Sequence, residues 1–311
     1  MSAIIKVSNL TKDFKEVKAV NNLSFTVNPG EVYGFLGQNG AGKSTTIRML
    51  LTLIRPTSGM IEIFGMDLQK HRNEILRQIG AIIEKPDLYK YLSALENLRI
   101  FAAMSRAKVS EKQLMDQLDM VGLSARAHSK VKTYSQGMKQ RLGIATALIH
   151  DPQLIILDEP TNGLDPQGIA DIRQLILHLS DDLKKTVVVS SHLLTEIELI
   201  ADSMIIIDKG KKLVEGKVTD LFDPAETVVE INTTNDDTAY NKLRQSHLGS
   251  FLLTKRSDAV LLKLHRDKVP GIMKEVMQMD LGVLSFHSKH SLEEYFLSLI
   301  TQHTNVEAAK N

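Results

Sequence analysis

The sequence predicts an α/β protein with a mainly parallel, buried central sheet, followed by a smaller α+β unit. Short runs of β-branched and other apolar residues alternate with helical stretches up to about residue 216. Some runs, such as "LIIL" at 154–157, are apolar throughout, which is typical of buried strands. Beyond residue 216 the order of the elements changes, and this change indicates a second unit.

Turn signals such as "NPG" and "TSG" separate the elements of the first unit. The expected strands are 24–27, 31–37, 61–65, 79–84, 153–158, 186–191 and 203–208. A helical region is expected from about Ser93 to Ser129, because it opens with the capping box "SALE". A further helix starts near Ser135. Its apolar stripe consists of Met138, Leu142, Ala145 and Ile149.

The second unit, residues 218–311, shows the order strand, helix, strand, strand, helix, strand, which suggests a small ferredoxin-like fold. The expected strands are 227–232, 251–256, 259–265 and 282–288, and the expected helices are 237–247, 269–279 and 291–300. The polar tail after residue 300 is expected to fray. We expect this unit to fold separately, as an accessory or regulatory domain beside a first domain at 1–217.

The composition excludes several classes of function. The 38 basic and 37 acidic residues give a net charge of +1, so nucleic acid is not an expected partner. The chain has no cysteine, which excludes disulfides, thiolate zinc sites and cysteine nucleophiles. There is no signal-peptide core and no run close to the roughly 18 apolar residues of a membrane helix. We therefore expect a soluble chain that reaches a membrane only through a partner.

The strongest chemical signal is "GQNGAGKST", which matches the phosphate-binding pattern G-x-x-x-x-G-K-[ST]. A strand leads into it and a helix leads out, so backbone N–H groups and a helix N-terminus converge on phosphate oxygens. Lys43 is expected to neutralise phosphate charge, and the Ser44 hydroxyl to bind Mg²⁺. A chance match in a glycine-rich turn is the alternative. The residues expected to hold the triphosphate are Gly37, Asn39, Gly40, Ala41, Gly42, Lys43, Ser44 and Thr45.

Two further strand ends carry polar groups. The strand at 154–157 is followed by Asp158 and Glu159, and two adjacent carboxylates at a strand end are costly unless they are used. Asp158 is placed to hold Mg²⁺, and Glu159 to orient or deprotonate the attacking water. The strand at 186–191 is followed by His192, which would lie at the same edge of the sheet. Solvated acids and a structural histidine are the alternatives.

In the order "GQNGAGKST", "YSQGM", "LIILDEP", "GLD" and "SSH", these motifs resemble the nucleotide-binding subunit of an ATP-binding cassette (ABC) transporter. The resemblance spans about residues 3–217. It implies a P-loop NTPase fold of the ABC ATPase type, with a helical subdomain at about 90–150 and hydrolysis of ATP with Mg²⁺. In that family two subunits pair head to tail, and each ATP lies between the phosphate loop of one subunit and the signature segment of the other. Ser135, Gln136 and Gly137 would then bind the ATP of a second copy in a homodimer.

The resemblance also implies roles for residues outside the phosphate loop. Phe14 corresponds to the aromatic residue that stacks on adenine, although a core Phe is the alternative, and Val20 would pack against the same base. Asp165 in "GLD" corresponds to an interface aspartate that couples the two ATP sites. His192 would contact the γ-phosphate.

Two segments depart from the family pattern. Glu84 stands where a glutamine is usual; its carboxylate can still reach Mg²⁺ or water, although it adds negative charge beside the triphosphate. The signature reads "YSQGM" where "LSGGQ" is commoner, so Gln136 and Met138 are substitutions. The serine and the fourth-position glycine remain, which preserves the groups expected to contact the γ-phosphate.

The resemblance implies a membrane partner. The segment Glu84–Tyr91, beside the helical subdomain, would dock a separate transmembrane permease, and the chain would be cytoplasmic and peripheral on the inner face of the cell membrane. A plain solvated bundle is the alternative for the subdomain. Within the family, "IIEKP", "YSQGM" and the C-terminal unit look most like exporters of bacitracin or lantibiotic-type peptides.

Other functions are less consistent with the sequence. A translation-linked ATPase of the same superfamily normally has two phosphate loops in one chain, and only one occurs here. A DNA-repair ATPase needs a long coiled coil between Lys43 and Ser135, where no sustained heptad pattern is found. A module that binds ATP without hydrolysis would lack the acid after Asp158, yet Glu159 is present. The sequence favours a transport ATPase that exports an antimicrobial peptide or another amphipathic compound.

Overall fold

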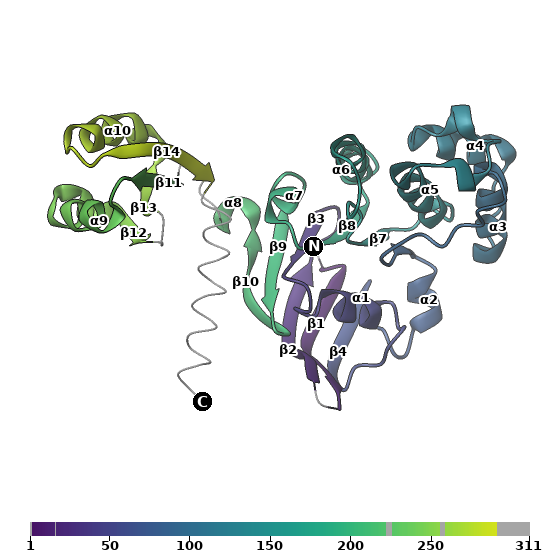
Figure 1. The fold of residues 1–311 in the computed structure, drawn as a ribbon. Coiled ribbons are helices and arrows are strands. Elements are labelled where there is room, and N and C mark those ends of the chain that lie inside the picture. Colours follow the sequence, from purple (N-terminus) through teal and green to yellow (C-terminus); the bar gives the residue numbers. More distant parts are fainter. Residues whose placement is uncertain (1, 16, 222–225, 256–258, 291–311) are drawn as a thin grey trace. The chain divides into compact units, whose positions relative to one another are not determined.

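The computed structural model describes residues 2–15, 17–221, 226–255 and 259–290. The helix expected at 291–300 lies outside these residues. The chain divides into two compact units, Met1–Val218 and Thr219–Asn311 (Figure 1). Each unit has its own cluster of buried apolar side chains, so each has the core that an independent domain needs.

The central sheet of the first unit has six strands in the order β10-β9-β3-β8-β7-β6. Neighbouring strands are parallel except β10, which runs antiparallel to β9. The strands are β3 (Val32–Leu36), β6 (Ile79–Ile82), β7 (Leu154–Asp158), β8 (Thr186–Ser191), β9 (Ser203–Asp208) and β10 (Lys211–Lys217). Every residue of β3, β7 and β8 is buried, as their sequences indicate. The expected parallel sheet is confirmed.

A second sheet in this unit is antiparallel, with the order β2-β1-β4-β5. Its strands are β1 (Ile5–Phe14), β2 (Val17–Val27), β4 (Ser58–Ile63) and β5 (Met66–Asp67). The runs at 24–27 and 61–65, expected within the alternating series, lie in β2 and β4 of this separate sheet. The connection from β1 to β2 is too short for a parallel crossover, so the two strands pair antiparallel.

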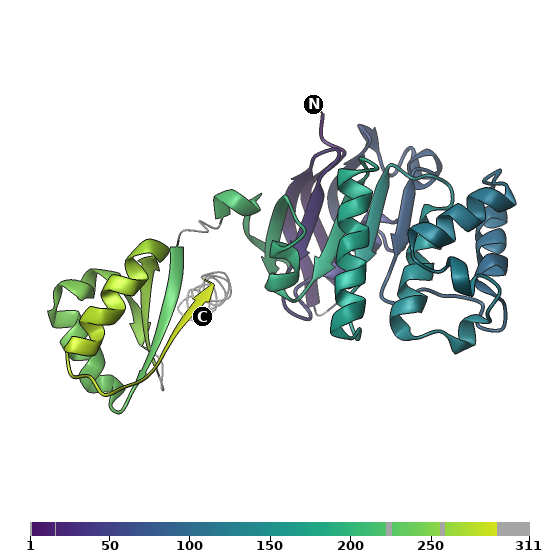
Figure 2. The ribbon, with the colours of Figure 1, turned by 90° about the horizontal axis from the view of Figure 1, so that it is seen from above.

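The helices of the first unit include a separate helical region at α3 to α5 (Figure 1 and Figure 2). The helices are α1 (Lys43–Leu50), α2 (Arg72–Leu76), α3 (Ala94–Ser105), α4 (Glu111–Met120), α5 (Gln136–Leu148), α6 (Pro166–Asp181), α7 (Leu194–Glu198) and, at the boundary of the units, α8 (Val218–Leu221). The capping box before α3 is confirmed, because Ser93 Oγ accepts from Glu96 N and the Glu96 carboxylate accepts from Ser93 N. Helix α5 begins after Ser135, which is its N-cap.

The second unit has a four-stranded antiparallel sheet of order β12-β13-β11-β14. Its main elements are β11 (Glu226–Thr233), α9 (Asp236–Gln245), β12 (Leu252–Lys255), β13 (Val260–His265), α10 (Val269–Gln278) and β14 (Val283–His290). Both helices lie on one face of the sheet (Figure 2). Leu243 of α9 and Val276 of α10 share a buried cluster with Ile231 and Leu262 of the central strands. The expected ferredoxin-like βαββαβ arrangement is confirmed.

We expect a fragment ending at Val218 to fold and to bind ATP with the affinity of the whole chain, because all the predicted nucleotide ligands and a complete core lie in the first unit. Circular dichroism would follow its thermal unfolding, and calorimetry its ATP binding. A folded, monodisperse fragment without ATP affinity would contradict this prediction.

Candidate nucleotide-binding and catalytic site

The loop after β3 packs tightly against two other backbone segments. A Cβ at Gly37 would lie 2.6 Å from the carbonyl oxygen of Ile207, and a Cβ at Gly42 would lie 2.6 Å from that of Ala19. Gly42 and Gly40 also have left-handed φ angles of +106° and +84°. The loop therefore requires glycine at these positions, for space and for backbone conformation.

Lys43 lies inside this loop and is only 5% exposed. Its Nζ donates to the carbonyl oxygens of Gly37 at 2.6 Å and of Gln38 at 3.3 Å, and lies 3.1 Å from Glu159 Oε1. Three acceptors thus fix the position of the ammonium group. The positive charge is held in the loop, as the binding of a phosphate requires.

The first turn of α1 adds hydroxyl groups to the loop. Ser44 and Thr45 are half-buried, and Asn39 is exposed. Thr46 is fully buried, and its Oγ1 donates to Gly42 O at 2.9 Å, which ties the loop to the helix. No acidic residue lies in this first turn, which favours the binding of an anion at the helix N-terminus.

The end of β7 carries two acids, and Ser190, near the end of the neighbouring strand β8, bonds both of them. Ser190 Oγ donates to Asp158 Oδ1 at 2.6 Å and accepts from Glu159 N at 2.9 Å. Asp158 is 1% exposed, and its Oδ2 has no hydrogen-bond partner among the described residues. A buried carboxylate oxygen without a partner is costly, and a bound cation would remove that cost.

Glu159 connects the phosphate loop to the end of β8. Its Oε1 pairs with Lys43, and its Oε2 lies 2.7 Å from His192 Nδ1. A carboxylate only accepts, so His192 Nδ1 carries the proton of this bond. Glu159 has a left-handed φ of +49°, and such strain is concentrated at functional sites. The structure therefore joins Lys43, Glu159 and His192 in one group.

These residues fit a nucleoside triphosphate with magnesium. Asp158 Oδ2 and the Ser44 hydroxyl are oxygen donors, which Mg²⁺ prefers. Within the described part of the chain, no group of three or more His, Asp or Glu side chains is placed to hold a metal ion. Mg²⁺ would therefore take most of its ligands from water and phosphate, as it usually does at nucleotide sites.

Glu84 lies two residues beyond β6 and has a left-handed φ of +59°. Its Oε1 is 2.6 Å from Arg48 Nη2 on α1. Arg48 is one helical turn after Ser44, so the Glu84 carboxylate is tied to the helix that carries the expected Mg²⁺ ligand. Arg48 also offsets the negative charge that Glu84 brings toward a triphosphate. The role of Glu84 as a metal ligand stays a prediction.

The two residues expected at the base differ in accessibility. Phe14, at the end of β1, is 46% exposed, so its ring is open to stacking and is not a core side chain. Lys12 Nζ lies 4.8 Å from the centre of this ring. Val20 is fully buried in the core cluster. Its side chain supports the back of the loop, 3.4 Å from where a Cβ of Gly42 would lie, and its contact with the base stays a prediction.

The signature segment 135–137 forms the start of α5. Ser135 is exposed, and its Oγ accepts from Met138 N at 3.2 Å, which leaves the hydroxyl proton for another acceptor. A Cβ at Gly137 would lie 3.8 Å from Gly168 Cα, and Gly168 N donates to Asp165 Oδ1 at 3.1 Å. The start of α5 and the cap of α6 are therefore neighbours.

Sequence reasoning assigned no role to Ser190 or Asn97. Ser190 bonds both Asp158 and Glu159. In the sequence, the sign of this role is a hydroxyl residue in a buried strand, and that strand pairs with the strand that carries the acids. Asn97 is fully buried on α3; its Oδ1 accepts from Tyr89 N, and its Nδ2 donates to Tyr89 O. In the sequence, the sign of this role is an asparagine among the apolar residues of the first turns of α3.

A phosphate loop between a parallel strand and a helix, with an acid pair at the same sheet edge, defines a P-loop nucleoside triphosphatase. Residues 20–162 match the model of the ABC transporter family. The bacitracin transport ATP-binding protein BcrA of Bacillus licheniformis is 43% identical over 303 residues, which are 96% of this chain and 98% of BcrA. The chain belongs to the ABC transporter family, as an ATP-binding subunit that hydrolyses ATP.

Two further relatives match over a shorter length. The lantibiotic transport ATP-binding protein SrtF of Streptococcus pyogenes is 41% identical over 228 residues, 73% of this chain and 95% of SrtF. The ATP-binding cassette MJ0796, solved as a dimer in a post-hydrolysis state with ADP and Pi, is 29% identical with a TM-score of 0.62, over 69% of this chain and 98% of its own. Both matched lengths are comparable to the first unit.

Proposed function

We propose that this chain hydrolyses ATP to drive the export of an antimicrobial peptide, or another amphipathic compound, through a separate membrane permease. The observation that supports the site most is the Lys43, Glu159 and His192 group beside the unpaired Asp158 Oδ2. The relatives named for bacitracin and lantibiotic transport support the substrate class.

In this proposal Glu159 accepts the proton of the attacking water. The bond from His192 Nδ1 orients the Glu159 carboxylate, and the imidazolium form, which carries a second proton on Nε2, can donate to the γ-phosphate. When ATP binds, Lys43 exchanges Glu159 Oε1 for phosphate oxygens, which frees that oxygen to take a proton. Ser44 and Asp158 would hold Mg²⁺, which would neutralise phosphate charge.

Two copies of the chain pair head to tail, and Ser135 acts on the ATP of the other copy. Support comes from the exposure of Ser135 and from its unused hydroxyl proton. The N–H groups at the start of α5, including that of Gly137, would contact the same γ-phosphate. Asp165, the cap of the neighbouring helix, would couple the two sites. The second unit would regulate or stabilise this pairing without supplying catalytic groups.

The permease docks near Glu84–Tyr91, and it holds the chain on the inner face of the membrane. Asn97 ties this segment to α3 through both backbone groups of Tyr89, which gives the docking segment a direct link to the helical region. Tyr89 and Tyr91 are 49% and 78% exposed, and exposed aromatic residues are typical of interface hot spots. No helix within the described residues is both long and apolar enough to cross a membrane.

The proposed function is tested by expressing the chain with a permease encoded beside it in a sensitive bacterium. We expect resistance to bacitracin or to a lantibiotic to rise with the natural chain, and not with Glu159→Gln. A purified complex that hydrolyses ATP but protects against none of these peptides would contradict the substrate class. A complex that does not hydrolyse ATP would contradict the function as a whole.

We expect Glu84→Ala to lower the permease-stimulated ATPase rate by roughly three- to tenfold and the basal rate much less. The substitution removes the ion pair with Arg48 that ties the docking segment to α1. Glu74→Ala is the matched control, because Glu74 is equally exposed, at 64%, and pairs with His71 on α2. Both rates are measured with and without permease. Equal losses in the two rates would mean that Glu84 serves the nucleotide alone.

A further inference from the structure

We propose that the turn Lys209–Gly210, which joins β9 to β10, is a backbone bridge that sets the distance between the base-binding and phosphate-binding parts of the ATP site. This inference rests on the proposed stacking of adenine on Phe14 and on the phosphate loop described above. Gly210 has no side chain to give the site, so its contribution is the position of the parts that do bind ATP.

Gly210 makes one hydrogen bond to each part. Its N donates to Ala41 O at 2.9 Å, and Ala41 is a buried residue of the phosphate loop. Its O accepts from Asn21 N at 2.8 Å, and Asn21 lies on β2. A single residue thus links the loop to the strand that follows Phe14.

Three backbone segments, from the phosphate loop, β2 and the turn, come close together at this point. Gly210 has a φ of +76°, and a Cβ on it would lie 2.7 Å from Ala19 O and 2.9 Å from Val20 Cα. A Cβ at Gly42 would lie 3.5 Å from Gly210 Cα. A Cβ at 210 would be too close to the backbone of β2, so any side chain there forces the turn and β2 apart.

The bridge matters because the two parts of the site belong to different sheets. Phe14 pairs with Val17 in the β1-β2 hairpin of the antiparallel sheet, so a shift of residues 19–21 is passed on to Phe14. The phosphate loop follows β3 of the parallel sheet. A second link, from Glu215 to Thr26 N and Tyr33 Oη, lies toward the other end of β2. Gly210 therefore fixes the end of β2 that faces the loop.

ATP spans both parts, whereas inorganic tripolyphosphate can contact the phosphate loop alone. A ligand that must fit two subsites at once loses affinity when their separation changes by a fraction of an ångström, and a ligand of one subsite does not. The ratio of the affinity for ATP to the affinity for tripolyphosphate therefore reports the separation of the two subsites. A general loss of protein stability does not change this ratio.

The test compares Gly210→Ala with Gly30→Ala in the full chain, measuring the Kd of ATP and of tripolyphosphate by calorimetry. Gly30 has the same φ of +76°, but a Cβ there meets nothing within 4 Å, so it controls for backbone strain. We expect Gly210→Ala to weaken ATP by about tenfold and tripolyphosphate by less than about twofold. Gly30→Ala should change neither affinity.

Asn21→Pro is a second variant. It removes the N–H that bonds Gly210 O and places a ring carbon against the same carbonyl, so it pushes the turn and β2 apart from the β2 side. Asn21 lies between the pairs Leu10–Leu23 and Lys12–Val20, where the β1-β2 register shifts. It should change the affinity ratio in the same direction as Gly210→Ala. If Gly210→Ala does not fold, Asn21→Pro decides the question alone.

Phe14→Ala separates the base-binding role of Phe14 from the role of the Gly210 bridge. It should weaken ATP and leave tripolyphosphate unchanged; if it weakens neither, the base-binding role of Phe14 fails, and the bridge with it. Suppose that Phe14→Ala behaves as expected, but Gly210→Ala and Asn21→Pro lower the affinities for ATP and tripolyphosphate equally, or lower only the stability of the protein. The bridge is then overturned, and the assignment of the ATP site is unaffected.

Discussion

We expect Glu159→Gln to lower the rate of ATP hydrolysis by about 100-fold or more while ATP still binds. The amide has the shape of the carboxylate and can still accept the bond from His192 Nδ1, but it cannot take a proton from water. The substitution also removes the negative charge 3.1 Å from Lys43 Nζ. Lys43 is then free for phosphate, so the affinity for ATP should be equal or higher.

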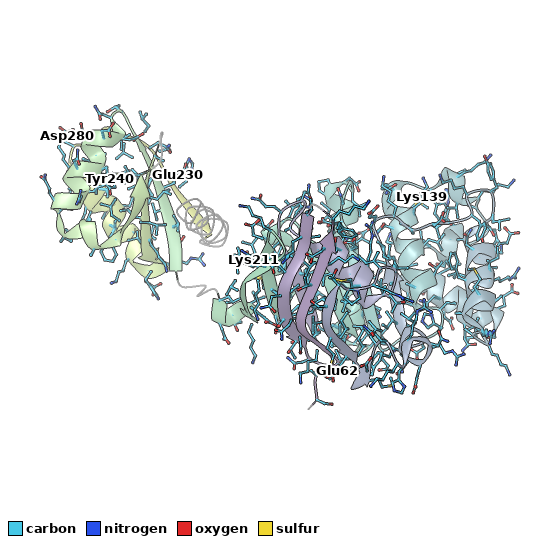
Figure 3. The ribbon with its side chains drawn as sticks, turned by 90° about the horizontal axis from the view of Figure 1, so that it is seen from below. Glu62, Lys139, Lys211, Glu230, Tyr240 and Asp280 are labelled. Atoms are coloured by element: carbon cyan, nitrogen blue, oxygen red, sulfur yellow. The ribbon has the colours of Figure 1, made fainter. Side chains whose placement is uncertain are left out.

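The measurements are the turnover rate and the Kd of ATP for the purified variant, with thermal unfolding to verify the fold. Glu62→Gln is the control, since Glu62 lies on β4 of the antiparallel sheet (Figure 3). It should turn over ATP at the natural rate. Near-natural turnover in Glu159→Gln would remove Glu159 from the catalytic role, and loss of ATP binding would mean that Glu159 mainly supports the loop.

We expect a heterodimer of Lys43→Ala and Ser135→Arg subunits to retain one ATP per dimer, although each variant alone retains none. In a head-to-tail pair both lesions fall in one site. The other site joins the intact Lys43 of one subunit to the intact Ser135 of its partner. Ser135 is exposed at the start of α5, so arginine there changes the surface offered to the other copy and leaves the buried loop around Lys43 intact.

The two subunits carry different tags, so that only the heterodimer is purified, and its bound nucleotide is counted after ATP-dependent dimerisation. This readout is used because hydrolysis can require two working sites. If Ser135 served the ATP of its own subunit, every site in the mixture would be damaged. A heterodimer with no more ATP than the homodimeric variants would therefore disprove the assignment in trans.

The phosphate loop and the two acids were identifiable from the sequence because their geometry is local. A β-strand, a glycine-rich turn and a helix follow one another directly, so they place Lys43 and Ser44 at the phosphate loop without help from distant segments. The buried strand β7 likewise fixes Asp158 at its end. The ferredoxin-like order of the second unit was identifiable for a similar reason, since its strands and helices alternate with clear turns.

Contacts between distant segments could not be read from the sequence. Val20 is buried in the core, because β2 pairs with β1 in an antiparallel sheet that the sequence pattern did not separate from the parallel one. The pairing of Glu84 with Arg48 joins two elements 36 residues apart. The interruption of β1 by polar residues between Val7 and Leu10 explains why this strand gave no clear period-two signal.

The sequence by itself determined the chemical groups and the elements that present them: a lysine in a glycine loop, an acid pair after a buried strand, a histidine after another. Only the tertiary structure decided that Glu159 bonds both Lys43 and His192, that Ser190 supports both acids, and that Gly210 joins the loop to β2. The physical reason is the distance along the chain over which each kind of interaction acts. Local backbone preferences act over a few residues, whereas these contacts depend on which strands become neighbours in the two sheets, and that is decided by the burial of the whole core.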